Sequence, residues 1–288
     1  MERGKASQKS AYLRMHAATL LFGVSGLLGR LCTSSAMTLV LGRALFAIAA
    51  LGLFGLLGST WKREGGALSR RDWLWLIPSG VLLALHFVTF FQGIQLGGIA
   101  VGTLGFACFP ALTALAEALV FRERPGSREI QAIVMVAFGL TLLVPMDAIF
   151  STQGAGLFFG VLSAAIYAGV AVLNRCLASD VSGTKASFWQ NGIIVLVLAP
   201  FASQGLWQAP PMDWLYFAGL GIFCTAVAYS LYVESLRSLA ARQAALIIAL
   251  EPVYTILLGW LVLGEVPNVL TCLGGVCILG AVYRLQNR

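Results

Sequence analysis

Long apolar segments separated by short polar connections run through the chain from one end to the other. Each segment has about 20 residues, enough to cross a hydrocarbon core of roughly 30 Å. Only a helix satisfies its backbone hydrogen bonds within one such segment, so the segments are predicted to be membrane-spanning helices. The ten expected spans are residues 14–33, 37–58, 73–94, 98–121, 128–146, 154–174, 186–203, 213–236, 241–263 and 268–285.

Composition agrees with this pattern, because 59% of the 288 residues are hydrophobic and 11% are charged. The connections are short, and none has the length or composition of a water-soluble domain. We therefore expect an all-α membrane protein folded as a single compact bundle, with the lipid bilayer as its surroundings.

Two stretches of the chain, residues 104–125 and 246–267, repeat each other at nine of 22 aligned positions. The first copy ends Phe-Arg-Glu-Arg-Pro and the second Leu-Gly-Glu-Val-Pro, so the second copy lacks both arginines. Such a loss is expected when the two copies end on opposite sides of a membrane. The sequence thus predicts two inverted five-helix repeats, residues 1–146 and 147–288, an architecture in which substrates bind where the halves meet.

The basic residues indicate the orientation of the chain. Of the 19 lysines and arginines, all but Arg30 and Arg43 lie at the termini or in every second connection. Positive charge accumulates on the cytoplasmic side of a membrane, so both termini are expected in the cytoplasm. The net charge of +7 therefore reflects orientation and does not indicate a nucleic-acid partner.

Several short features resemble a known family, and together they cover nearly the whole chain. They are Arg43 in the second expected span, Gly160, Ala164, Tyr167 and Ala168 in the sixth, Glu251-Pro252 in the ninth, and the repeated Glu123-Arg-Pro125 and Glu265-Val-Pro267. These features resemble the EamA family of the drug/metabolite transporter superfamily. The aromatic third span with its histidine is similar to YddG-type amino-acid exporters. The chain departs from its relatives at Phe22-Gly23, where they commonly carry Trp-Gly.

This resemblance implies a ten-helix bundle in the cell inner membrane, with a central cavity that alternates between outward-open and inward-open states. It also implies export, since amino-acid members of the family work as exporters. We expect a small-molecule substrate, namely a neutral or aromatic amino acid, and a monomeric protein. The alternative is export of lipophilic cations or another small metabolite.

Polar and aromatic residues near the bilayer middle are candidates for substrate binding, because placing polar groups there is otherwise costly. His86 lies near the middle of the third expected span, with Phe90 on the same helical face. An imidazole can bind a carboxylate or carry a proton near neutral pH. The alternative for His86 is a hydrogen bond that holds two helices together.

Four tyrosines also lie well inside expected spans: Tyr167, Tyr229, Tyr232 and Tyr254. Ser163 shares a helical face with Tyr167. A buried phenol needs a hydrogen-bond partner, which can be another helix or a ligand. Aromatic faces also attract an ammonium group by about 0.5–2 kcal/mol. Tyr167, Ser163, Tyr229 and Tyr232 are therefore predicted to line a substrate pocket.

Pro110 and Pro252 occupy equivalent positions in the two repeats, in the middle of expected spans. Proline lacks the backbone N–H of an uninterrupted helix, so both are predicted to be hinges. The preceding residues, Phe109 and Glu251, differ between the copies and are expected to contact substrate. Glu251 would cost at least about 2.5–3.5 kcal/mol if unpaired at that depth. It could bind an amine, carry a proton or pair with Arg43, for which an intraprotein bond is expected.

An enzyme is not indicated, so no catalytic residues are predicted. The chain has two histidines and no HExxH, CxxC or phosphate-binding glycine loop, and we expect neither a metal nor a cofactor. A passive channel would be expected to carry a filter motif or to form an oligomeric ring.

Overall fold

The computed structural model describes residues 2–57, 68–120, 126–143, 149–177, 181, 183–235, 247–248 and 250–286. Every regular element in these ranges is a helix, as predicted. They are α1 (Glu2–Leu31), α2 (Ala36–Leu57), α4 (Arg70–Phe106), α5 (Phe109–Val120), α6 (Ser127–Thr141), α7 (Thr152–Leu177), α8 (Gly183–Trp207), α9 (Pro211–Ala218), the π-helix η2 (Gly219–Val227), α10 (Ala228–Ser235), α12 (Glu251–Leu263) and α13 (Val269–Gln286). Parts of the two repeated stretches, including residues 121–125 and 246, lie outside the described residues.

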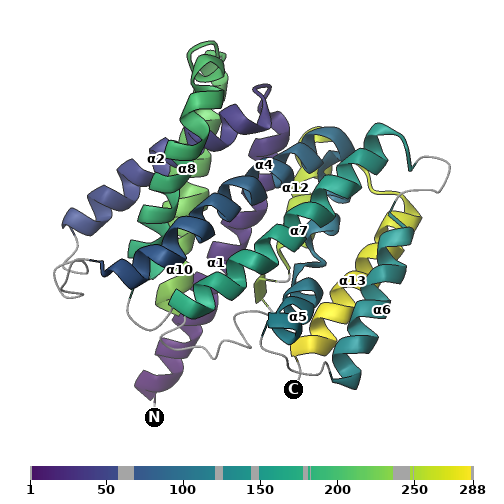
Figure 1. Cartoon of the computed structure of the whole chain (residues 1–288). Coiled ribbons are helices and arrows are strands. Elements are labelled where there is room, and N and C mark those ends of the chain that lie inside the picture. The colour runs from purple at the N-terminus through teal and green to yellow at the C-terminus, as the bar shows by residue number, and fades with distance from the viewer. Residues whose placement is uncertain are drawn as a thin grey trace.

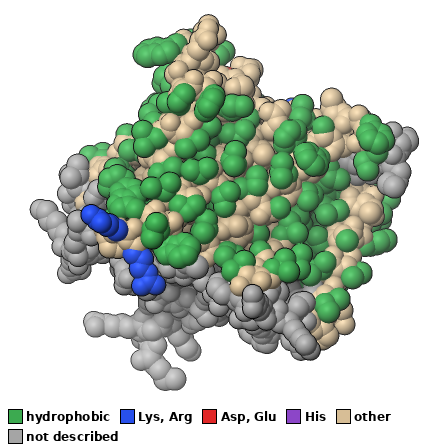
Figure 2. All heavy atoms as spheres, viewed as in Figure 1, with side chains coloured by type: hydrophobic (Ala, Val, Ile, Leu, Met, Phe, Trp, Pro, Cys, Tyr) green, Lys and Arg blue, Asp and Glu red, His purple; other side chains and the backbone are tan. Residues whose placement is uncertain are grey.

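The surface of the bundle is suited to lipid. Within the described residues, six helices are long and apolar enough to cross a membrane, and the shorter apolar helices are Ile130–Thr141, Glu251–Leu263 and Val269–Arg284. Large hydrophobic side chains such as Leu196 and Phe201 point outward, with exposed fractions of 75% and 78%. Hydrophobic side chains cover most of the face in Figure 2, and the visible basic ones lie at its lower left. The chain is therefore a multi-pass membrane protein.

The helices form one bundle whose two ends can be told apart (Figure 1). We call the end where α1 begins and α13 ends the terminal end, and the opposite end the far end. Helices α4 and α7 pack most extensively and cross the middle of the bundle; α2 pairs with α8 on one side and α6 with α13 on the other.

The third and fourth expected spans, 73–94 and 98–121, differ from the prediction in how they are joined and where they break. Helix α4 covers the third expected span and the first part of the fourth, as far as Phe106, and it bends sharply between them at Gly98, whose φ is 80°. Glycine adopts this left-handed conformation without a steric penalty. A Cβ on Gly102 would lie 2.7 Å from the backbone nitrogen of Ile94, so the segment after the bend lies directly on the segment before it.

The role of the two prolines as hinges stays a prediction, and the structure shows where they lie. Pro110 lies in the first turn of α5, after the turn at residues 107–108, and Pro252 lies in the first turn of α12. The first turn of a helix does not use the backbone N–H that proline lacks, which explains this placement. The fourth expected span is thus interrupted within its length by non-helical backbone.

Helices α4 and α7 approach each other at glycines. A Cβ on Gly97 would lie 2.9 Å from the Cα of Gly156, and one on Gly160 would lie 3.2 Å from the Cα of Gly105. Small residues of this kind allow membrane helices to pack backbone against backbone. We call this contact the glycine seam.

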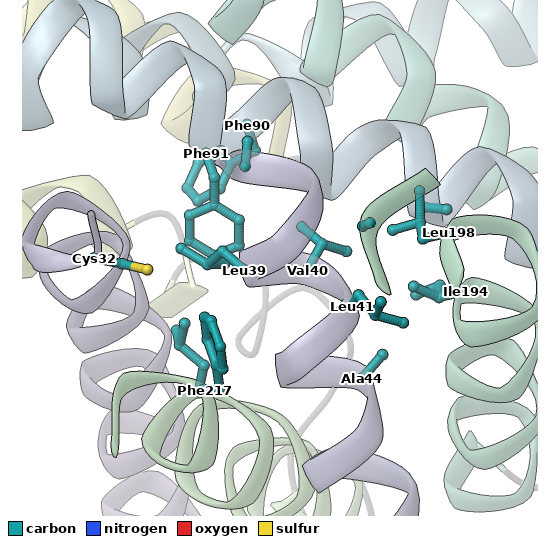
Figure 3. Packing of buried hydrophobic residues seen from close by; sticks show 14 of the residues in the cluster. Cys32, Leu39, Val40, Leu41, Ala44, Phe90, Phe91, Ile194, Leu198 and Phe217 are labelled. Atoms are coloured by element: carbon teal, nitrogen blue, oxygen red, sulfur yellow. The ribbon is translucent and has the colours of Figure 1, made fainter. Parts of the chain in front are cut away.

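A buried hydrophobic cluster joins helices from both halves of the chain (Figure 3). Its members shown there include Leu39, Val40, Leu41 and Ala44 of α2, Phe90 and Phe91 of α4, Ile194 and Leu198 of α8, and Phe217 of α9. Together with the glycine seam, this core fixes the walls of the cavity described next.

Candidate functional site

A cavity of about 820 Å³ lies inside the bundle, and helices from both halves of the chain line it. It collects most of the side chains predicted for substrate binding. Those that line it are His86, Phe90, Phe109, Tyr167, Tyr229, Tyr232 and Glu251, together with Pro110 and Pro252. Ser163 and Tyr254 are not among its lining residues.

His86 projects from α4 toward α7, and one of its ring nitrogens forms hydrogen bonds with α7. Its Nδ1 lies 2.8 Å from the Ser163 hydroxyl oxygen and 3.2 Å from the Ser163 carbonyl oxygen. The Ser163 hydroxyl also donates to the His86 carbonyl oxygen at 3.2 Å. In the tautomer that satisfies this arrangement, Nδ1 carries the proton and donates to Ser163. Nε2 is then the nitrogen that remains to accept a hydrogen bond from a ligand.

Aromatic rings surround His86 and form one wall of the cavity. The His86 ring centroid lies 4.7 Å from Tyr167 and 5.1 Å from Phe106. Phe106 in turn stacks on Phe109, with centroids 5.1 Å apart and an interplanar angle of 13°. We call the level of His86, Phe106, Phe109 and Tyr167 the aromatic layer.

Arg43 of α2 also lines the cavity, although its side chain is 6% exposed. Its Nε donates to the Thr225 hydroxyl at 3.0 Å, which confirms the expected intraprotein bond. Its guanidinium carbon lies 3.7 Å from the centre of the Phe87 ring, a cation–π contact. The π-helical turn that presents Thr225 is closed by a hydrogen bond from this hydroxyl to the Leu220 carbonyl oxygen at 2.8 Å.

Glu251 begins α12 and supplies the acidic group of the cavity. The ion pairs within the described residues are Arg14–Glu234 and Arg30–Glu265, so Glu251 and Arg43 face the cavity without a direct salt bridge. The cavity therefore combines a cation and an anion with an aromatic wall.

Uncharged polar side chains line the part of the cavity nearest the terminal end. Asn174 of α7 and Gln190 and Asn191 of α8 line it, with Ser187 beside them. These residues were not predicted to bind substrate, because Gln190 and Asn191 lie near the end of an expected span, where interface anchoring is common. The feature that could have indicated them is three amide side chains within expected spans.

The far end of the bundle is held together by acidic side chains with several partners. Glu265 accepts from Arg30 Nε at 2.7 Å and from the backbone N–H of Ile99 at 2.9 Å, next to the bend at Gly98. Asp213, 1% exposed, accepts from the backbone N–H groups and hydroxyls of Thr33 and Ser34 at 2.6–3.3 Å. The contacts of Asp213 join α9 to the connection between α1 and α2. The contact of Glu265 with Arg30 joins the segment after α12 to α1.

Metal ligands do not gather at the site, since no group of three or more His, Cys, Asp or Glu side chains is found among the described residues. The chemistry that the cavity offers is hydrogen bonding, charge pairing and contact with aromatic rings.

A lipid-facing helical bundle that encloses a polar and aromatic cavity is typical of membrane transporters. The model of the EamA-like transporter family matches residues 9–144 and again residues 154–285. The chain therefore belongs to the EamA-like transporter family, as its sequence features predicted.

Individual relatives agree with this assignment. The chain is 26% identical over 282 residues to the uncharacterized transporter YxxF of Bacillus subtilis (strain 168), covering 96% of this chain and 90% of the relative. It is also 26% identical over 285 residues to the pseudopaline exporter CntI of Pseudomonas aeruginosa, covering 97% and 96%. A protein of known crystal structure shares the fold with a TM-score of 0.64 at 19% identity, covering 97% of this chain and 98% of the other.

Proposed function

We propose that this transporter exports neutral or aromatic amino acids from the cytoplasm across the cell inner membrane. The observation that supports this substrate class is the pairing, within one cavity, of Arg43 and Glu251 with an aromatic wall. An amino acid carries a carboxylate and an ammonium group on the same carbon, so it presents both of the charges that these side chains complement.

Each group of such a substrate has a partner in the cavity. The substrate carboxylate pairs with the Arg43 guanidinium, whose Nε is held by Thr225 and whose face is held by Phe87. The ammonium group pairs with Glu251 and donates to Nε2 of His86. The rings of Phe106, Phe109 and Tyr167 contact an apolar or aromatic side chain.

Transport follows from alternating access in a bundle of ten membrane crossings, built from two inverted five-helix repeats with both termini in the cytoplasm. The terminal end is then the cytoplasmic end, consistent with the distribution of lysine and arginine. The contacts of Glu265 and Asp213 close the far end, so the substrate enters from the cytoplasm in this state. The name of the similar pseudopaline exporter supports the direction of transport.

Export of lipophilic cations is the second candidate, because Glu251 and the aromatic layer together could hold a cation. Arg43 argues against it, since its positive charge lines the same cavity and would repel such a substrate.

Counterflow in liposomes tests the proposal. Purified protein with excess unlabelled amino acid inside is expected to accumulate labelled neutral or aromatic amino acids, and Glu251→Gln and His86→Ala are expected to lose this uptake. Glu234→Gln is the matched control, because Glu234 pairs with Arg14 and does not line the cavity. Folded wild-type protein that accumulates lipophilic cations and no amino acid would refute the substrate class.

A further inference from the structure

The cavity has a second level, closer to the terminal end than the aromatic layer. On α4, Ser79 lies seven residues before His86, and on α7, Asn174 lies seven residues after Tyr167. Both offsets are two helical turns, or about 10 Å along the helix axes. Gln190 of α8 connects the two helices at this level, since its Nε2 donates to the Ser79 hydroxyl at 3.0 Å and to Asn174 Oδ1 at 2.9 Å.

Two polar atoms near this level have no partner. Among the described residues, the buried side-chain oxygens and nitrogens without a hydrogen bond are Asn191 Oδ1 and Thr113 Oγ1. Both residues line the cavity, from α8 and α5. Asn191 is 2% exposed, and its Nδ2 donates to the Ser187 carbonyl oxygen at 2.8 Å, so the unbonded atom of its amide is the acceptor.

A buried polar atom without a partner is costly, and such atoms are normally satisfied by protein, water or ligand. Both residues line the same cavity, so a group bound there could supply the missing partner of Asn191 Oδ1. Asn191 Oδ1 can only accept, so this group must carry a donor such as a hydroxyl or an amide N–H.

Charge separates this level from the aromatic layer. Arg43 and Glu251 are the Arg, Lys, Asp or Glu side chains among the described residues that line the cavity. Arg43 stacks on Phe87, the neighbour of His86, and therefore lies beside the aromatic layer. By contrast, Asn174, Gln190 and Asn191 offer only neutral hydrogen-bonding groups.

The size of the cavity also exceeds what a free amino acid needs. Its volume of about 820 Å³ lies near the upper end of the roughly 300–1,000 Å³ of sites for drug-sized ligands. An extended dipeptide spans about 7 Å along its backbone and reaches further with its side chain. A substrate of this length reaches from the charged pair to the second level.

We propose that Thr113, Asn174, Gln190 and Asn191 form an uncharged subsite that binds a hydroxyl or carboxamide at the far end of the substrate. The preferred substrates are then amino-acid derivatives of dipeptide size with a neutral donor at that end. This rests on the proposed function in placing the charged end of the substrate between Arg43 and Glu251.

The test is ligand-induced thermal stabilisation of the purified protein, which requires binding and not transport. The probes are N5-(2-hydroxyethyl)-L-glutamine and N5-propyl-L-glutamine, which carry both charges on one carbon, have the same length and differ in the terminal hydroxyl. The wild type is expected to bind the hydroxyl-bearing probe about five- to tenfold more tightly, the effect of one or two net hydrogen bonds. Asn191→Leu and Thr113→Val are each expected to reduce this preference.

Thr89→Val is the matched control for Thr113→Val, because the Thr89 hydroxyl bonds the Leu85 carbonyl and Thr89 does not line the cavity. It is expected to keep the preference. Equal binding of the two probes by the wild type, or a preference unchanged in Asn191→Leu, would overturn the subsite and leave water as the partner of these atoms. If amino-acid counterflow then still proceeds, the proposed function stands without the subsite. A preference for the hydroxyl-bearing probe without amino-acid counterflow would keep the subsite and refute the proposed function.

Discussion

The far end of the bundle and the cavity contain acidic side chains in opposite situations. Asp213 accepts four hydrogen bonds and Glu265 accepts from both Arg30 and Ile99. In the cavity, Glu251 forms no ion pair among the described residues. The difference separates two roles, since a satisfied acid contributes to stability and an unsatisfied one is left to bind a ligand. Substitutions at the two places should therefore affect different measurements.

The largest effect is expected from Asp213→Ala, which leaves the donors of Thr33 and Ser34 without their acceptor. Hydrogen bonds to a charged group contribute about 1.5–3 kcal/mol each, and solvent can satisfy part of the loss. We expect the free energy of unfolding to fall by about 3 kcal/mol, measured by denaturation in detergent. Asp72→Ala is the control, because this exposed residue caps α4 with Ser69 and its loss should cost only about 1 kcal/mol. Equal losses in both variants would contradict the comparison.

The second-largest effect is expected from Glu251→Gln, which should weaken substrate binding. Removing the charge leaves the substrate ammonium without its partner, so the dissociation constant should rise by about 10- to 100-fold. The free energy of unfolding should not fall, because no ion pair is broken. The dissociation constant from ligand-induced stabilisation and the unfolding curve of the unliganded protein check the two parts. A Glu251→Gln variant that is less stable but binds substrate with unchanged affinity would show that Glu251 stabilises the fold and does not bind substrate.

A smaller effect is expected at the ion pair of Arg30 and Glu265, whose side chains are 36% and 29% exposed. Ion pairs with this access to solvent contribute about 0–1 kcal/mol. A double-mutant cycle with Arg30→Gln and Glu265→Gln should give a coupling free energy in this range. Arg30 also donates to the Gln95 carbonyl oxygen, whereas the bond from the Ile99 N–H to Glu265 can be kept by a glutamine oxygen. Arg30→Gln should therefore destabilise more than Glu265→Gln. The reverse order would show that the bond at the Gly98 bend needs the charge of the carboxylate.

The smallest effect is expected at Thr113, and it compares the same substitution at two places on the cavity wall. Thr113→Val removes a hydroxyl without a partner and should change the free energy of unfolding by less than about 0.5 kcal/mol. Thr225→Val removes the hydroxyl that bonds both Arg43 and Leu220, so a loss of about 1 kcal/mol is expected. Thermal unfolding of the unliganded variants measures the two losses of stability. Equal losses in Thr113→Val and Thr225→Val would contradict the prediction.

Sequence was sufficient to predict the helical bundle and most of the cavity wall. Hydropathy gave the depth of His86, Phe109, Tyr167 and Glu251, and all four line the cavity. Hydropathy does not show which way a side chain points around the helix axis. Ser163 was therefore expected to face substrate, whereas its hydroxyl bonds His86. Helical periodicity placed Ser163 and Tyr167 on one face without showing which neighbouring helix that face contacts.

Other features depend on contacts between distant parts of the chain. Tyr254 was expected among the midplane tyrosines, but its hydroxyl lies 3.1 Å from Nδ1 of His16. Asp213 meets residues about 180 positions earlier in the chain, and no local pattern predicts such a pairing. The π-helix over Gly219–Val227 changes the register of α10, so the 3.6-residue period cannot place Tyr229 and Tyr232 relative to Thr225.

The glycine seam has a mechanical consequence. Its helices come from opposite halves of the chain, yet their backbones touch at Gly97 and Gly156 with no side chain between them. A contact of this kind cannot slide without steric overlap, whereas a contact through flexible side chains can adjust. If the two halves rock as proposed, we expect the pivot at α4 and α7, so that His86 and Tyr167 move together while the opposing wall of the cavity moves past them.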